Sequence, residues 1–135
     1  MAEPPAGYTE TRLIDPFEIY VGPVLEKGEK GAKRFALRVD KRHLNMRGVV
    51  HGGMLMTFAD AALGQAAWDA TDRAPSVTLN MQTHFLRGAK EGDLIEVVPK
   101  LMRQTRALLF IRGDFTVSGE VVMTVASVWK LLGQD

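Results

Sequence analysis

The sequence contains no cysteine, and its charges nearly cancel. Without cysteine there is no disulfide, thiol nucleophile, cysteine zinc site or iron–sulfur cluster, which fits a reducing compartment. Because 17 basic residues face 16 acidic ones, no broad surface of one sign is available for nucleic acid or an anionic membrane. A basic start followed by an apolar run is also missing, as is any run of ~20 apolar residues. We therefore expect a cytoplasmic protein without nucleic-acid or membrane partners.

The chain is long enough for one domain with a real core. It has 135 residues, of which 46% are hydrophobic and 24% charged, an ordinary globular composition. Pro4, Pro5 and Gly7 lie in a stretch with few large apolar groups. We therefore predict a flexible N-terminal arm over residues 1–15 and a single domain over residues 16–135.

The hydrophobic pattern predicts one long helix among several strands. Residues 54–70 are rich in alanine, leucine and methionine, so they favour a helix that is buried on nearly all sides. Six segments have strand character: 19–25, 34–39, 77–85, 94–102, 108–117 and 120–132. Their short connections, including a hairpin turn at 26–31, are typical of antiparallel neighbours.

These elements predict an α+β fold in which an antiparallel sheet curls round one central helix. Such an open sheet leaves long strands at its edges, and we expect the strand that ends at Leu132 to be one of them. Pairing between subunits would cover these edges, so the protein is expected to be an oligomer.

Asp60 is the first candidate for chemistry. It lies in the middle of the predicted helix, between apolar residues on both sides. A helical aspartate usually reaches solvent or caps a neighbour, but this helix is too apolar for that. A buried, unpaired carboxylate costs several kcal/mol, so a functional use is the better interpretation.

The loop before this helix holds the next candidates. His51, Gly52 and Gly53 open the helix, where they form either a simple entry turn capped by His51 or a site for an oxyanion at bare N–H groups. Asn45 precedes them, and asparagine in a loop is more often turn chemistry. His43 and His84 are expected to be structural or exposed, because the histidine spacing does not suggest a metal site. The serines also lack the G-x-S-x-G spacing of a serine hydrolase.

Basic residues near strand ends are candidates for phosphate binding. They are either solvated turn residues or, two or three together, a local phosphate site. The four concerned are Arg87, Lys90, Arg103 and Arg106.

Five loop residues and one helix residue together resemble a known family. The loop follows the pattern N-x-x-G-x-x-H-G-G, formed by Asn45, Gly48, His51, Gly52 and Gly53. Asp60 follows nine positions after the histidine. This spacing, followed by four strands, resembles the hotdog-fold acyl-CoA thioesterases. It is most similar to the phenylacetate-type (PaaI-like) subgroup of the hydroxybenzoyl-CoA thioesterase superfamily, from about residue 17 to residue 132.

The resemblance implies an architecture and a reaction. A hotdog fold wraps its sheet round the helix, and two subunits share a sheet, often pairing again into a homotetramer. Asp60 of one chain would face His51 and Gly52 of the other. The family hydrolyses an acyl-CoA thioester to free CoA and a carboxylic acid. It needs no metal or other cofactor, since coenzyme A is part of the substrate.

The resemblance also implies residue roles. Asp60 would be the general base or the nucleophile, the Gly52 N–H the oxyanion donor, and Asn45 and His51 positioning groups. Thr78, 18 positions after the acid, would lie near the attacking water. Substrate-binding roles would fall to Gly53, Arg87, Lys90, Arg103 and Arg106. A non-catalytic acyl-CoA-binding or regulatory hotdog protein is the alternative. A hydratase of this fold is a third interpretation, but the helix-entry motif of those enzymes is not found here.

Overall fold

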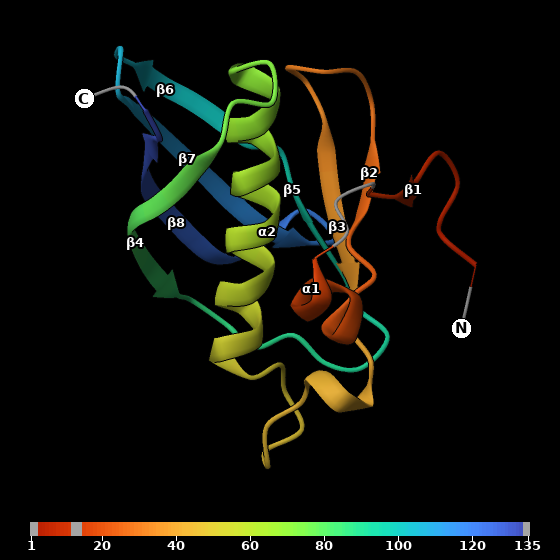
Figure 1. Cartoon of the computed structure of the whole chain (residues 1–135). Coiled ribbons are helices and arrows are strands. Elements are labelled where there is room, and N and C mark those ends of the chain that lie inside the picture. Colours follow the sequence, from red (N-terminus) through yellow and green to blue (C-terminus); the bar gives the residue numbers. More distant parts are fainter. Residues whose placement is uncertain (1–2, 12–14, 134–135) are drawn as a thin grey trace.

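The structure is an antiparallel sheet wrapped round one long helix, α2 (Gly52–Ala70) (Figure 1). This computed structural model describes residues 3–11 and 15–133. The predicted α+β class and the central helix are confirmed, with the helix starting two residues earlier than the sequence suggests. Among the described residues, no helix is both long and apolar enough to cross a bilayer.

Within residues 3–11 and 15–133 the sheet has eight strands, and β4 lies at one edge. The strands are β1 (Thr9–Glu10), β2 (Leu25–Lys27), β3 (Arg34–Arg38), β4 (Ser76–Phe85), β5 (Leu94–Val97), β6 (Lys100–Gln104), β7 (Leu108–Val117) and β8 (Glu120–Leu131). Their order is β1-β2-β3-β5-β7-β8-β4, and β6 also pairs with β7. The expectation that the strand ending at Leu132 forms an edge is wrong, because β8 pairs with β7 on one side and β4 on the other. On this side of the sheet the free edge is therefore β4.

The core fixes how α2 lies on the sheet. Phe58 of α2 meets Phe115 of β7 edge to face, with ring centroids 5.4 Å apart. Gly113 of β7 is needed for this close approach, since a Cβ there would lie 2.8 Å from Val97 and within 3.4 Å of Leu63. Aromatic burial of this kind holds the helix in one position against the sheet.

Two predicted strands take a different form. The strand expected over residues 19–25 is wrong, because α1 (Pro16–Val21) is a helix and β2 begins only at Leu25. The Asp15 side chain accepts hydrogen bonds from the N–H groups of Phe17 and Glu18, and Pro16 suits the first helical position. The single strand expected over residues 94–102 is divided into β5 and β6, with Pro99 between them.

The N-terminal segment is attached to the sheet at Tyr8. This side chain is 6% exposed, its hydroxyl donates a hydrogen bond to Glu96, and β1 pairs with β2. Burial and the Glu96 carboxylate raise the pKa of Tyr8. Residues 12–14 lie outside the described residues, and the flexibility of the arm stays a prediction.

One stripe of α2 is open to solvent, which is more exposure than the burial on nearly all sides that the sequence predicts. Gly53 and Asp60 are exposed, and Thr57 and Gly64 are half-buried. These residues recur every three or four positions, so they share one helix face. This face lies beside the free edge of β4.

Candidate active site

Asp60 and Thr78 form the centre of the candidate site. Asp60 projects from the open face of α2, and Thr78 lies on the adjacent edge strand β4. The Thr78 hydroxyl donates a hydrogen bond of 2.7 Å to Asp60 Oδ1. The expectation that Asp60 is buried is wrong for the single chain, because its side chain is exposed. The bond to Thr78 fixes one carboxylate oxygen and leaves the other open to a ligand.

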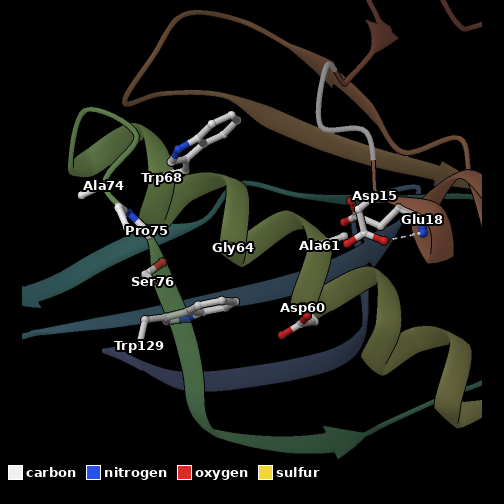
Figure 2. Close-up of a pocket in the computed structure, with 10 residues that line it drawn as sticks. All are labelled: Asp15, Glu18, Asp60, Ala61, Gly64, Trp68, Ala74, Pro75, Ser76 and Trp129. Carbon is white, nitrogen blue, oxygen red and sulfur yellow. Dashed lines mark hydrogen bonds between the residues drawn. The ribbon is translucent and has the colours of Figure 1, made fainter. Parts of the chain in front are cut away.

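A cavity of about 290 Å³ adjoins Asp60 (Figure 2). Two tryptophans line it, Trp68 from α2 and Trp129 from β8. Gly64 lies between them, and a Cβ at this position would lie 3.1 Å from the Trp129 ring. The remaining lining residues are Asp15, Glu18, Ala61, Ala74, Pro75 and Ser76. The carboxylate thus stands at the side of a space with aromatic walls.

The start of α2 presents a backbone donor. His51 is the N-cap, and its Nδ1 accepts a 2.9 Å hydrogen bond from the Gly53 N–H, so the turn uses this ring nitrogen. A Cβ at Gly53 would come within 3.1 Å of the same atom. Within the described part of the chain, nothing accepts a hydrogen bond from the Gly52 N–H. This N–H lies at the positive end of the α2 dipole and suits an oxyanion.

Asn45 holds the loop before the helix. Its Oδ1 accepts hydrogen bonds from the N–H groups of Arg47 (2.9 Å) and Val49 (3.3 Å). Gly48 completes the turn with a φ of +80°, a conformation that suits glycine. Since the amide oxygen is occupied by the turn, only the Asn45 amide nitrogen is left to contact a substrate.

His43 joins this loop to α1. The ring is 3% exposed, its Nδ1 accepts from the Asp40 N–H, and its Nε2–H donates to Val21 O over 2.6 Å. Its backbone oxygen accepts from the His51 N–H. His43 therefore has a structural role and His84 is exposed, as predicted.

The four basic candidates divide between two regions. Arg87 forms an ion pair with Glu120. The backbone of Lys90 forms an isolated β-bridge with that of Val49, close to the start of α2. Arg103 lies on β6, and Arg106 lies on the turn that follows it. In this turn the Ala107 backbone oxygen accepts a hydrogen bond from the Leu131 N–H, so both arginines lie beyond the end of α2. Since α2 is ~28 Å long, these two groups cannot hold one phosphate within a single chain.

Glu18 is the residue that the sequence analysis missed. It lies on α1, lines the cavity and is half-buried. Burial and the nearby charges of Asp15 and Asp60 raise the pKa of the Glu18 carboxyl. A signal is present in the sequence, because Asp15 followed by Pro16 is a typical helix start.

Comparisons with known proteins agree on one family. The model of the Thioesterase superfamily matches residues 47–124. A putative esterase of Pseudomonas aeruginosa is 32% identical over 97 residues, 71% of this chain and 72% of the relative. Human acyl-coenzyme A thioesterase 13 is 28% identical over 101 residues, 74% of this chain and 72% of the relative.

A solved structure agrees with the sequence relatives. A variant of the phenylacetic acid degradation protein PaaI of Thermus thermophilus superposes with a TM-score of 0.78. It is 25% identical to this chain, and the match covers 87% of this chain and all of that one. Fold and motif therefore agree, and the chain belongs to the thioesterase superfamily as a hotdog-fold thioester hydrolase.

Proposed function

We propose that this protein hydrolyses acyl-CoA thioesters with Asp60 as the reacting carboxylate. The observation that carries the proposal is the Asp60–Thr78 pair at the side of a cavity with aromatic walls. A thioester carbonyl is electrophilic and a thiolate leaves readily. One carboxylate, one oxyanion donor and one water are therefore enough chemistry. The relative named an acyl-coenzyme A thioesterase supports this substrate class.

The reaction has two possible courses at Asp60. As a general base, Asp60 takes a proton from water, the water oxygen bonds to the carbonyl carbon, the C–S bond breaks, and the proton passes to the CoA thiolate. As a nucleophile, Asp60 forms an acyl anhydride and expels the thiolate, and water then cleaves the anhydride. Thr78 holds the carboxylate in either case, and the Gly52 N–H binds the carbonyl oxygen.

Two copies of the chain are needed to bring these groups to one substrate. Gly52 and Asp60 are eight residues apart on α2, a rise of ~12 Å, so one carbonyl group cannot reach both within a chain. The free edge of β4 offers a surface for a second copy, with Val77, Leu79 and Phe85 about half exposed. Two-fold pairing along this edge places Asp60 of one copy near Gly52 of the other.

The other roles follow this arrangement. His51 and Asn45 position the substrate or the water, and Gly53 leaves room at the helix start. Arg87 and Lys90 lie beside the oxyanion donor of their own chain, and Arg103 and Arg106 reach the site from the other copy to bind CoA phosphates. The further pairing of dimers into a tetramer stays a prediction, measured by light scattering.

Thiol release with a chromogenic disulfide reagent tests the function. The panel runs from acetyl- to palmitoyl-CoA and includes phenylacetyl- and hydroxybenzoyl-CoA. The chain has no cysteine, so the protein adds no signal. We expect turnover that disappears in Asp60→Asn with the fold retained. Parent-rate hydrolysis by this variant would overturn the role of Asp60. Binding without hydrolysis across the panel would favour the non-catalytic binding alternative.

Isotope labelling and trapping separate the two courses of reaction. With enzyme in excess over substrate in H₂¹⁸O, a general base leaves Asp60 unlabelled and puts ¹⁸O into the product. An anhydride that water cleaves at the Asp60 carbonyl carbon gives the opposite result, because the product then carries an Asp60 oxygen. Cleavage at the acyl carbon labels the product as a general base does, but borohydride would reduce this anhydride at Asp60 to an alcohol. Mass spectrometry of the Asp60 peptide and of the product detects each outcome.

A further inference from the structure

We propose that Glu18 determines which acyl groups the enzyme accepts, by excluding acyl chains that end in a carboxylate. This inference rests on the proposed function, since it takes the cavity beside Asp60 as the acyl site. It adds a residue outside the motif that links the chain to its family.

The cavity fits the acyl part of a substrate. Its walls include the indole rings of Trp68 and Trp129, with Gly64 leaving the space between them open. Apolar and aromatic walls bind a hydrocarbon or aryl group and disfavour a charged one. Asp60 borders the same space, so an acyl group bound there extends away from the reacting carbonyl.

Three carboxylates line this space, those of Asp15 and Glu18 at the start of α1 and that of Asp60 on α2. Figure 2 shows Asp15 and Glu18 together at one side of the cavity, on the same side as Asp60. Asp15 is engaged in capping α1, because its carboxylate accepts from two backbone N–H groups. Among the described residues, nothing forms such a bond with the Glu18 side chain, which is half-buried at the cavity. The described residues contain no group of acids and histidines arranged to hold a metal ion.

The helix that carries Glu18 is held in place by Arg42 and His43, which lie in the segment before α2. The Arg42 guanidinium donates hydrogen bonds to the backbone oxygens of Tyr20 and Gly22, and His43 donates to Val21 O. These three carbonyls end α1, where cationic and N–H donors stabilise a helix. Since His43 also bonds the His51 backbone, α1 and the start of α2 keep a fixed relative position.

The expected specificity follows from this charge. A carboxylate at the far end of an acyl chain would enter a partly desolvated space beside Glu18 and Asp60, where like charges repel. An uncharged chain meets no such cost, and a chain ending in an ammonium group is attracted. The substrate class is therefore acyl-CoA with a neutral or cationic acyl group.

Three acyl-CoAs of equal chain length test this inference: hexanoyl-CoA, adipoyl-CoA and 6-aminohexanoyl-CoA. For the parent enzyme we expect kcat/KM for adipoyl-CoA to be at least about tenfold below that for hexanoyl-CoA. In Glu18→Gln, a variant of the same shape, this ratio should shrink several-fold, and in Glu18→Lys it should invert. Glu29→Gln is the matched control, because Glu29 is an exposed acid on the β2–β3 turn and its loss changes net charge equally.

Each result has one meaning. An unchanged adipoyl-to-hexanoyl ratio in Glu18→Gln, with parent-like thermal unfolding, overturns the inference and leaves the thioesterase proposal intact. An equal fall for all three substrates also overturns it, since Glu18 would then act through Asp60. If the parent hydrolyses none of these three and none of the wider acyl-CoA panel, the proposed function fails instead. The same ratio is then read from the Kd values of the three acyl-CoAs.

Discussion

At the scale of single residues, Gly52 allows a clean test of the oxyanion donor. Gly52→Pro removes the N–H, yet proline is tolerated at the first position of a helix. The preceding His51 already has φ −61° and ψ 134°, the extended conformation that a following proline requires. We expect kcat to fall about 10²- to 10³-fold with the fold retained. Stopped-flow kinetics measure kcat, and circular dichroism shows whether the fold is retained.

Gly52→Ala is the matched control for this variant. It keeps the N–H and adds a Cβ at 3.5 Å from the Phe85 ring, an ordinary van der Waals distance. Its kcat should therefore stay within a few-fold of the parent. If the alanine variant loses as much activity as the proline variant, the N–H is not the group that matters.

A second prediction at this scale concerns the contribution of Lys33 to the stability of the fold. Its ammonium lies 2.9 Å from Glu26 and 3.2 Å from Asp69, and each of the three side chains is only 16% or 17% exposed. Lys33→Met leaves two carboxylates together without a cation. We expect the free energy of unfolding to fall by about 2–3 kcal/mol at pH 7, measured in urea. Lys30→Met is the control. The ion pair between Lys30 and Asp72 is open to solvent, so its loss should leave the free energy of unfolding unchanged.

The pH dependence of this difference has a definite sign. Burial alone lowers the pKa of Lys33, but the hydrogen bonds and charges of Glu26 and Asp69 outweigh it, so the pKa is raised on folding. A raised pKa stabilises the fold below the unfolded value of 10.5, and this stability disappears as pH rises through the folded pKa. The gap between parent and Lys33→Met should therefore narrow above about pH 10.5. A constant gap up to about pH 12 would contradict this account.

At the scale of elements, the position of α1 depends on Arg42. Removing its guanidinium in Arg42→Ala leaves two carbonyls at the end of a six-residue helix without their donors. We expect faster hydrogen exchange at the amides of Ile19 and Gly22, which bond within this helix, measured by NMR. Arg47→Ala, an exposed residue of the neighbouring loop, should leave these rates unchanged.

The elements also show which parts of the fold a sequence can predict. The long helix, the strand Arg34–Arg38 and the β7–β8 hairpin have strong local periodicity, and all three are predicted correctly. The helix α1 is missed, because Ile19 and Val21 favour strand locally while the Asp15 cap and the contacts from Arg42 and His43 decide the structure. The exposure of Asp60 is not predictable either, since it depends on which strand forms the sheet edge.

At the scale of the whole molecule, the edge of β4 is expected to form the dimer. Leu79 is 55% exposed on this strand, and Leu79→Glu would place a charge in the apolar contact between copies. We expect this variant to be monomeric by light scattering and inactive. Leu101→Glu makes the same change at a residue of β6 that is 44% exposed, and it should remain a dimer. A dimeric Leu79→Glu would place the interface elsewhere.

If each active site is shared between two chains, a mixture of two inactive variants should give a result that a site within one chain cannot give. Asp60→Asn and Gly52→Pro are each expected to be inactive as homodimers. In a heterodimer of the two, one site carries both lesions, while the other combines an intact Asp60 with an intact Gly52 from the opposite copy. A random one-to-one mixture refolded together should therefore recover about a quarter of the parent activity, because about half of the dimers are mixed. If Asp60 and Gly52 of the same chain formed each site, every site would carry a lesion and activity would stay at background.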